Sequence, residues 1–360
     1  MHQQRRRKKL SRQVVAVDLF CGIGALTRGL LDAGIKVKAG YDIEEACRYG
    51  YNKNNQVDFF RENVADLKGE TLMRHFPDKS LKVLVGCAPC QPFSTHTNKL
   101  KDKPAEDERW NLLDAFGKLV EEVRPDFVSM ENVPNLQHQD VFTRFVTKLN
   151  ELDYKVTPKV VYCPDYGIPQ KRKRLVLLAS LYAKPCLIER THFPETYRSA
   201  KSVIDHLPEI EAGEICETDL LHRSPNMNEI MLKRIRASKP NGTWLDWEES
   251  LRTNCHKTEK GFSYKSVYGR MDWNEPSPTI TTQFYNFGTG RFGHPIQDRA
   301  LSLREGALLQ TFPEDYEFVE SQAKIEFSKI GRFIGNAVPV RLGQVIGQSI
   351  IEHFSLHSLI

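Results

Sequence analysis

The stretch VGCAPCQPFS contains two cysteines, Cys87 and Cys90, that are separated by two residues. This spacing suits three kinds of chemistry. The two thiols could form a redox couple, they could supply half of a zinc site, or one thiol could act as a nucleophile beside a bystander. Other parts of the chain must decide, because the spacing alone is compatible with all three.

Acidic residues and glycines earlier in the chain indicate a binding site for an adenosine group. Asp18 precedes the turn glycines of CGIG, and glycines let the backbone pass close to a ligand. Asp42 follows at a distance of about 20 residues, where a carboxylate can bind both hydroxyls of a ribose. Asp66 is then expected to accept from the adenine amine. Thr27 stands where a dinucleotide fingerprint has its third glycine, so the pattern favours adenosine without a pyrophosphate.

Strands that alternate with helices are expected to position these groups. Short apolar runs at 14–20, 35–43, 81–87 and 126–133 predict four buried strands, and a weaker strand is expected before Asp66. Helical spacing follows the first run and returns in WNLLDAFGKLVEEV. This order predicts an α/β fold with a doubly wound parallel sheet, which binds ligands at the carboxyl ends of its strands. The polar motifs lie at those ends.

The later part of the chain has a different composition. Residues 181–274, here called the recognition segment, are rich in Pro, Asn, His, Trp and charge without a sustained period, so a separate loop-rich unit is expected. Regular patterning returns with SLREGALLQTFP, and a final apolar-periodic helix could pack back on the sheet. The predicted division is a basic disordered tail at 1–13, a catalytic and cofactor-binding domain at 14–180, a small domain at 181–325 and a C-terminal return at 326–360.

Composition and charge narrow the class of protein. The chain has 360 residues, of which 40% are apolar and 27% charged, and this suits a globular protein of two domains. No run of about 18 apolar residues is present. Eight irregularly spaced cysteines do not make a disulfide framework, so reduced thiols in a cytoplasm are expected. The net charge of +5, with basic clusters in RRRKK, QKRKR and KRIR, is compatible with a polyanionic partner.

A series of motifs runs through the chain between about residues 14 and 345, in the order DLFCGIG, Asp42, Asp66, PCQPFS, MENVPNL, QKRKR, REGALLQTFP and GNAVP. In this order the motifs resemble those of the DNA cytosine carbon-5 methyltransferases. The resemblance implies a Rossmann-like sheet that binds S-adenosylmethionine, a smaller DNA-recognition domain, double-stranded DNA as partner, and a target cytosine flipped from the helix. The expected context is bacterial restriction-modification with a separately acting endonuclease, and the expected state is a monomer near the nucleoid.

This resemblance and the local chemistry together favour Cys90 as a single nucleophile. The Cys-x-x-Cys stretch follows a strand and enters a loop, whereas a redox pair is expected at the start of a helix. A zinc site needs a second ligand pair of suitable spacing, which the sequence lacks, so no metal is expected. Cys87 is interpreted as a small buried hydrophobe. The implied role of Cys90 is attack on carbon 6 of cytosine, which makes carbon 5 nucleophilic toward a methyl sulfonium.

A carboxylate and two arginines are expected to assist this thiol. The resemblance implies that Glu131 holds the ring nitrogen and exocyclic amine of the flipped base and donates a proton or a strong hydrogen bond. Gln170, Arg172 and Arg174 alternate, so on one strand their side chains would share a face. There the guanidinium groups could stabilise the thiolate and bind the base carbonyl. The sequence does not decide which arginine contacts the base.

The remaining site residues follow from the resemblance. The expected cofactor contacts are Asp18, Phe20, Gly22, Gly24, Asp42, Ile43, Asp66, Pro89, Leu112, Asn336 and Val338. The expected DNA contacts are Gln91, Ser94, Gln170, Arg223, Arg234 and Arg236. The composition of the recognition segment, which also contains Trp244, Trp247, His222 and Lys239, fits this role, because arginines and polar side chains read base edges while backbone donors and lysines contact phosphates. Arg304 and Glu305 are interpreted as an internal ion pair at the domain junction.

Two alternatives remain open. An RNA cytosine methyltransferase of the same architecture would keep Cys90 and Glu131, but it is expected to have a shorter insert between QKRKR and REGALLQ. A catalytically silent DNA-binding relative should have lost Cys90, Glu131 or an arginine, and all of them are present.

Overall fold

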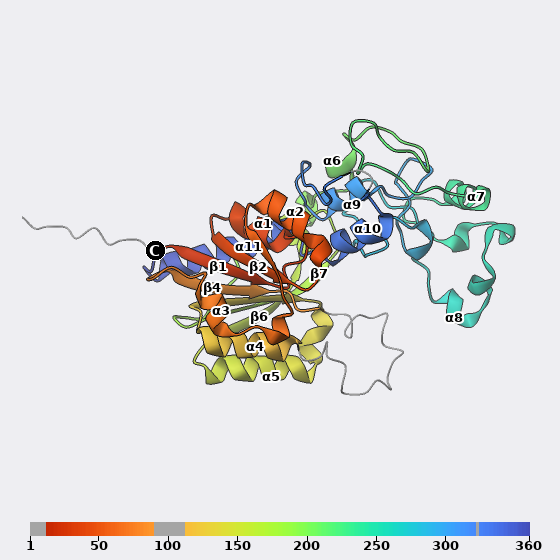
Figure 1. Ribbon diagram of the computed structural model, residues 1–360. Helices are drawn as coiled ribbons and strands as arrows, with labels where there is room; N and C mark the ends of the chain where they lie inside the picture. The colour runs from red at the N-terminus through yellow and green to blue at the C-terminus, as the bar shows by residue number, and fades with distance from the viewer. Residues whose placement is uncertain (1–11, 90–111, 322–323) are drawn as a thin grey trace, which may run out of the picture.

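The computed structural model describes residues 12–89, 112–321 and 324–360, and these residues form one sheet of seven strands (Figure 1). The strand order is β3-β2-β1-β4-β5-β7-β6. The strands are β1 (Val14–Leu19), β2 (Lys36–Asp42), β3 (Asp58–Arg61), β4 (Leu81–Gly86), β5 (Phe127–Asn132), β6 (Lys155–Tyr162) and β7 (Lys173–Ser180). All pairings among β1 to β5 are parallel, whereas β7 is antiparallel to both β5 and β6. The predicted doubly wound α/β fold is confirmed, and the antiparallel pair is an addition to it.

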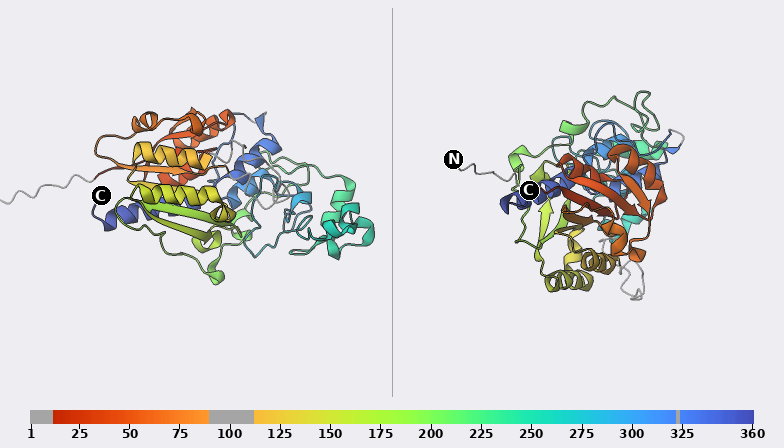
Figure 2. Two further views of the ribbon diagram at one scale, coloured as in Figure 1. Left: turned by 90° about the horizontal axis from the view of Figure 1, so that it is seen from below. Right: turned by 60° about the vertical axis from the view of Figure 1, so that its left-hand side comes forward.

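Helices cover both faces of the sheet (Figures 1 and 2). One face carries α1 (Ala25–Asp32), α2 (Arg48–Asn55) and α11 (Val340–Leu356). The opposite face carries α3 (Gly69–Met73), α4 (Leu112–Val123) and α5 (Asp140–Glu151). This two-sided cover explains the nearly continuous apolar strands, because both faces of each inner strand are removed from water. Among the helices of the described segments, none is long and apolar enough to cross a membrane.

The side chains of β1 show how one short run serves two layers. All six residues of VVAVDL are buried. Successive side chains of a strand point to opposite faces, so Val14 and Ala16 pack in the cluster that contains α1 and α11. Val15, Val17 and Leu19 pack in the cluster that contains α4 and α5. The apolar core therefore holds β1 from both sides and fixes the position of its carboxyl end.

The chain beyond β7 forms a loop-rich region, residues 181–325, which extends to one side of the sheet (Figures 1 and 2). Its helices in the described residues are α6 (Lys201–Ile204), α7 (Glu229–Ala237), α8 (Glu259–Phe262) and α9 (Leu303–Leu309). A separate apolar cluster forms there around Trp244, Trp247 and Phe287. We call residues 181–325 the small region.

The end of the small region packs with the main core. Leu303 and Leu309 of α9 belong to the same apolar cluster as Ile330 and Ile334 of α10 (Phe327–Asn336), and this cluster continues into α1 and α11. The predicted division between residues 325 and 326 thus crosses continuous packing. The domain boundaries stay a prediction.

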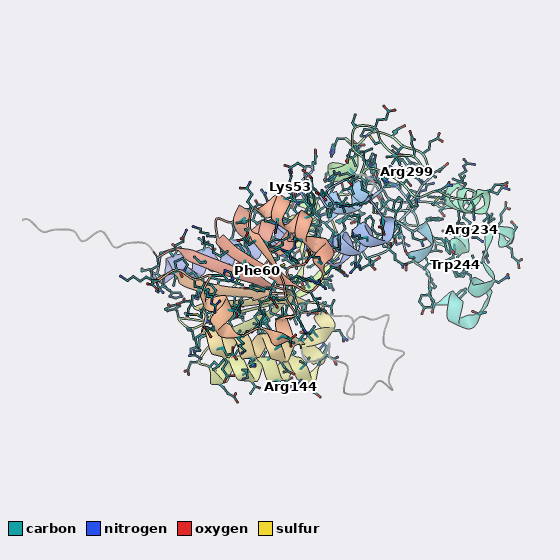
Figure 3. The ribbon with its side chains drawn as sticks, viewed as in Figure 1. Lys53, Phe60, Arg144, Arg234, Trp244 and Arg299 are labelled. Atoms are coloured by element: carbon teal, nitrogen blue, oxygen red, sulfur yellow. The ribbon has the colours of Figure 1, made fainter. Side chains whose placement is uncertain are left out.

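A buried ion pair braces the small region. Arg299, labelled in Figure 3, donates to the two carboxylate oxygens of Glu305 at 2.8 and 2.7 Å, and both side chains are 1% exposed. Burial raises the pKa of Glu305, but the facing Arg299 outweighs burial and lowers it to about 2. Arg304 pairs with Asp219 instead. The interpretation of Arg304 and Glu305 as one ion pair is wrong, because adjacent residues on a helix do not face each other.

The C-terminal helix packs on α1 through two glycines. A Cβ on Gly29 would lie 2.3 Å from the carbonyl oxygen of Val340 and 2.6 Å from the backbone carbon of Gly343. A Cβ on Gly343 would lie 3.0 Å from the carbonyl oxygen of Leu26. The backbones of the two helices therefore approach closely, and the expectation that the last helix packs back on the sheet is confirmed.

We expect Gly29→Ala to lower the free energy of unfolding by about 2 kcal/mol, because the added methyl group meets backbone atoms that cannot move aside. The effect is opposite to helix propensity, which favours alanine over glycine by about 1 kcal/mol. Denaturant unfolding measures it. Gly117→Ala in α4 is the matched control, since its Cβ would meet only side-chain atoms at 3.3 Å or more. Equal stability of the two variants would contradict the close approach of α1 and α11.

Candidate functional site

A cavity of about 340 Å³ lies where the carboxyl ends of β1, β2 and β4 meet the end of α10. In doubly wound sheets this edge is the usual place for a ligand. The cavity is lined by Cys87 and by nine of the expected site residues, which are Phe20, Gly22, Asp42, Ile43, Pro89, Arg172, Arg174, Asn336 and Val338. It thus joins the expected adenosine contacts and the two arginines in one space.

The turn after β1 forms the floor of this cavity. Phe20 has a φ of 57°, a left-handed conformation that is uncommon for a bulky residue and occurs mostly at functional or strained positions. Gly22 has a φ of 50°, and no heavy atom lies within 4 Å of the place of a Cβ there. The amide of Cys21 donates to the carbonyl of Tyr41 at 3.1 Å. The backbone of the turn therefore faces open space and is fastened to β2.

Asp42 connects the turns after β1 and β2. Its Oδ2 accepts from the amide of Gly22 at 2.8 Å, and its Oδ1 accepts from the amide of Glu44 at 2.9 Å. Burial raises the pKa of Asp42, and the two backbone donors oppose that shift. Each carboxylate oxygen keeps further acceptor capacity toward the cavity. Two ribose hydroxyls suit such a group, so the residues present fit an adenosine-bearing cofactor.

Two expected cofactor residues lie beneath the cavity instead of lining it. Asp18 is fully buried, and its Oδ2 accepts from the hydroxyl of Thr27 at 2.7 Å. Burial raises the pKa of Asp18 to about 7. Gly24 begins α1, and a Cβ there would lie 2.3 Å from the side-chain nitrogen of Asn55. Both residues contact protein atoms next to the turn and do not line the cavity.

Asp66 and Leu112 also lie outside the lining of the cavity. Asp66 is exposed at the end of a short 3-10 turn (Val64–Asp66) that follows β3. Leu112 is partly buried at the start of α4. In this structure neither side chain contacts the cavity that Asp42 lines.

Glu131 lies at the end of β5 and is 3% exposed. Its Oε1 forms an ion pair with Nε of Arg174 at 2.8 Å, although the angle does not meet hydrogen-bond geometry. Its Oε2 accepts from Sγ of Cys87 at 2.8 Å. Cys87 packs against the main core, as expected, but it is only partly buried and its thiol contacts the carboxylate. The interpretation of Cys87 as a buried hydrophobe alone is therefore wrong.

The two arginines have different surroundings. Arg172 is 2% exposed and donates to the carbonyls of Ile280 at 2.9 Å and Gly335 at 3.3 Å. Arg174 is the one that faces Glu131. β7 begins at Lys173, so the expected strand from residue 170 is wrong in its first part. Gln170 and Arg172 precede β7, so the prediction that alternate residues share one face of a strand does not apply to them.

Gln170 is an internal brace. It is fully buried, and its Nε2 donates to Oε1 of Gln310 at 2.9 Å while its Oε1 accepts from the amide of Ile280 at 2.8 Å. Every polar atom of its side chain is engaged within the protein. In this structure Gln170 presents nothing to a DNA cleft.

Side chains expected to read DNA are partly engaged within the small region. Arg223 donates to the carbonyl of Leu220 at 2.7 Å, and Arg234 donates to the carbonyl of Leu251 at 2.8 Å. Arg236 is exposed and pairs with Asp298 at 3.2 Å. Arg234 also lies over the ring of Trp247. Of the arginines predicted to contact DNA, Arg236 is the most accessible.

The aromatic side chains of the recognition segment form its interior. Trp244, labelled in Figure 3 beside Arg234, is 1% exposed, and its ring stacks on that of His256 at 4.1 Å. Trp247 is 2% exposed, and its indole nitrogen donates to Ser238. His222 is fully buried between Ser302 and the carbonyl of Pro208. These three residues support the fold of the region and do not face a ligand.

Cys90, Gln91 and Ser94 lie outside the described residues. Pro89, the last described residue before them, is exposed and lines the cavity. Within the described segments, no group of three or more His, Cys, Asp or Glu side chains is arranged to hold a metal ion. A larger hollow of about 590 Å³ beside β6 contains none of the motif residues.

Sequence reasoning missed one contact at the mouth of the cavity. Arg332 of α10 pairs with Glu44 at 2.7 Å, and both residues line the cavity. This ion pair lowers the pKa of Glu44. The two residues are far apart in the sequence and belong to no motif, so no local signal could have joined them.

Comparison with known sequences assigns the chain to a family. The profile of the family described as C-5 cytosine-specific DNA methylase matches residues 14–352. The Type II methylase M.HgiDII of Herpetosiphon aurantiacus is 48% identical over 337 residues, which cover 93% of this chain and 94% of that protein. The Type II methyltransferase M1.HphI of Haemophilus parahaemolyticus is 30% identical and covers 93% and 86%.

Solved structures share the fold at lower identity. A prophage-encoded Escherichia coli protein assigned as a DNA modification methyltransferase has a TM-score of 0.71 and 21% identity, with 95% of this chain and 100% of that chain covered. The Entamoeba histolytica methyltransferase EhMeth has a TM-score of 0.65 and 16% identity, with 95% and 99% covered. The resemblance inferred from the motifs is confirmed: the chain belongs to the C-5 cytosine-specific DNA methylase family, whose members use S-adenosylmethionine to methylate cytosine in DNA.

Proposed function

We propose that this enzyme methylates carbon 5 of one cytosine, flipped out of a short specific sequence in duplex DNA, through a covalent adduct with Cys90. The observation that carries the proposal is the shared lining of the cavity. Asp42 and the turn after β1 line one part of it, while Cys87, Arg172 and Arg174 line another. Since Cys87 and Arg174 are the two contacts of Glu131, the expected cofactor site adjoins the expected base site.

The protein's part in the reaction begins with the thiolate of Cys90. It adds to carbon 6 of the cytosine, and the electron pair displaced from the 5,6 double bond makes carbon 5 nucleophilic. When bound, S-adenosylmethionine supplies an electrophilic methyl group. After carbon 5 has been methylated, its proton is removed and the thiolate leaves, which restores the double bond.

Glu131 and Arg174 are the groups that would polarise the ring. Glu131 ends a buried strand and is 3% exposed, so a hydrogen bond from it acts in a nearly water-free site, where electrostatic stabilisation is strong. Arg174 is the better candidate for the base carbonyl, because Arg172 is occupied by backbone carbonyls and Arg174 faces Glu131. Arg172 then supports the cavity wall.

The cofactor assignment rests on the strand-end groups. Asp42 would bind the ribose hydroxyls, and the backbone of the turn at Phe20 and Gly22 would lie along the cofactor. Ile43 is 64% exposed beside Asp42 and offers an apolar surface to the adenine. Arg332 and Glu44, which form an ion pair, line the same cavity beside these groups.

The biological setting is proposed from the relatives. M.HgiDII and M1.HphI are named as Type II enzymes, so a Type II modification role with a separately acting endonuclease is proposed here. We propose a monomer that acts in the cytoplasm near the nucleoid. The RNA alternative is disfavoured because the matching profile is that of DNA methylases. A silent relative is disfavoured because Cys90, Glu131, Arg172 and Arg174 are all present.

Asp42→Ala should weaken binding of S-adenosylmethionine by about 10- to 100-fold, because it removes the acceptors for both ribose hydroxyls. Isothermal titration calorimetry measures the affinity, and thermal unfolding checks the fold. Asp32→Ala is the control, since Asp32 is an exposed residue of α1 that pairs with Arg28 in the same helix. An unchanged affinity in folded Asp42→Ala protein would remove Asp42 from the cofactor site.

Duplex DNA with 5-fluorocytosine at the target should become permanently attached to the enzyme in the presence of S-adenosylmethionine. Fluorine cannot leave carbon 5 as a cation, so the adduct cannot resolve. Denaturing gel electrophoresis should show the complex. Cys90→Ser should abolish it, because a neutral hydroxyl lacks the nucleophilicity of a thiolate.

Cys87→Ser is the matched control in the trapping experiment and should keep the adduct. A redox couple or a zinc site would need both thiols and predicts that the two serine variants fail alike. Equal loss of the adduct in folded Cys87→Ser and Cys90→Ser proteins would therefore overturn the single-nucleophile mechanism. The same sequence offered as RNA should give little or no adduct.

Replacing residues 181–274 with the matching segment of a relative that has another site should move the methylated sequence. The physical reason is that base-edge contacts specify the sequence, whereas phosphate contacts supply affinity. Bisulfite sequencing of DNA from a methylation-free host reports base and site together. A folded and active graft with the old specificity would refute the recognition role of this segment.

A further inference from the structure

The register of the sheet places Cys87 beside Glu131. The parallel pairing of β4 and β5 ends with Gly86 opposite Met130, so Cys87 and Glu131 are the next pair along the two strands. Side chains at corresponding positions of paired strands leave the sheet on the same face. The contact between Sγ and Oε2 at 2.8 Å is the result. Cys87 is the first residue after β4, so the contact follows directly on the last backbone pair of the two strands.

The next pair of residues fixes the same junction. The side-chain amide of Asn132 donates to the carbonyl of Ala88 at 2.9 Å, one residue beyond the contact between Cys87 and Glu131. Asn132 is 2% exposed, so this bond is shielded from water. Two successive bonds therefore tie the end of β5 to the chain that leads from β4 to Cys90.

The two oxygens of Glu131 face different partners. Oε2 faces the thiol of Cys87, and Oε1 faces Nε of Arg174. The last torsion of a glutamate side chain is broad, so its carboxylate can rotate unless a neighbour holds it. A donor on Oε2 fixes the plane of the group and leaves Oε1 directed toward Arg174. Of the two oxygens, Oε1 is then the one available to a base that displaces the arginine.

A thiol is a suitable donor for this purpose. It is a weak donor to neutral acceptors, but a carboxylate acceptor strengthens the bond. It is also small and apolar enough to pack against the main core, as Cys87 does. A lysine or arginine at this place would add another positive charge beside Arg174 and compete with it for Glu131.

We propose that Cys87 is a positioning residue for Glu131, which holds Oε2 through its S–H group so that Oε1 meets the target cytosine. The proposal rests on the proposed function, in which Glu131 contacts the base. Cys87 does not itself touch the reacting atoms in this mechanism. What matters is the donor and its position, so serine should substitute for cysteine and alanine should not.

The test measures the rate of methyl transfer under single-turnover conditions with a duplex carrying the target site. Cys87→Ala should lower this rate by about tenfold, the usual worth of one hydrogen bond to a charged group. The affinities for DNA and S-adenosylmethionine should stay within about twofold, since neither ligand loses a contact. Cys87→Ser should restore most of the rate. Cys186→Ala, which removes an exposed thiol, is the control and should behave as the parent enzyme.

The proposal also predicts how two substitutions combine. In a Glu131→Gln background, Cys87→Ala should cause no further loss, because the carboxylate that it orients is already gone. A merely structural Cys87 would lower the rate in both backgrounds alike. Cys87→Val fills the volume of the side chain but has no donor. It takes the place of Cys87→Ala in these measurements if the alanine variant does not fold.

Three results would overturn the proposal: a parental rate in both Cys87→Ala and Cys87→Val, a serine variant as slow as alanine, or an undiminished effect of Cys87→Ala in Glu131→Gln protein. The proposed contact of Glu131 with the base is tested separately. If Glu131→Gln alone keeps the full rate, both the proposed base contact and the positioning role fail. If Glu131→Gln is slow while Cys87→Ala is fast, only the positioning role fails.

Discussion

A buried guanidinium joins the chain segments that enclose the cavity. Arg172 donates to the carbonyls of Ile280, Gly335 and Ala337, which come from the small region and the end of α10. Ile280 lies in irregular backbone, while Gly335 and Ala337 lie at the end of α10, where the last carbonyls lack helical partners. An unsatisfied buried carbonyl is costly. The side chain of Arg172 therefore supplies the hydrogen bonds that these backbone carbonyls would receive in a helix or a sheet. The positions of Asn336 and Val338 on the cavity wall depend on it.

The sheet and this junction contribute differently to the site. Cys87 meets Glu131, and the turn after β1 meets Asp42, just beyond the last pairs of neighbouring parallel strands, which end at one edge of the sheet. The junction brings in groups that register cannot reach, such as Arg332 against Glu44. Chemistry that needs fixed distances lies on the regular part. The contact between Arg332 and Glu44 joins α10 to the turn after β2 and lies outside the strand pairing.

Sequence reasoning predicted the strands of the sheet well and the contacts of the irregular segments poorly. Valine-rich runs and turn glycines identified β1, β2, β4 and β5, and the spacing of Asp42 placed it at the cavity. Gln170 and Arg234 were expected to face DNA because they are polar, yet both are held by protein atoms. A sequence states that a side chain can donate a hydrogen bond but not which acceptor folding will bring to it. In loop-rich segments, where no period constrains direction, that information comes only from the fold.

The surroundings of Glu131 show how the fold holds a buried carboxylate, the group proposed to bind the base. An unpaired charge in a site that is 3% exposed would be strongly destabilising, so the fold supplies Arg174 and Cys87 as partners. In the proposed mechanism the base amine donates to Glu131, the base carbonyl oxygen accepts from Arg174, and the ring nitrogen, which is an acceptor, is bound when Glu131 carries a proton. Arg174 can then transfer its contact from Oε1 to the base carbonyl without leaving the site, while Cys87 keeps Oε2. Base binding exchanges partners among groups that are already desolvated, and such preorganised groups need little reorganisation when charge develops on the ring.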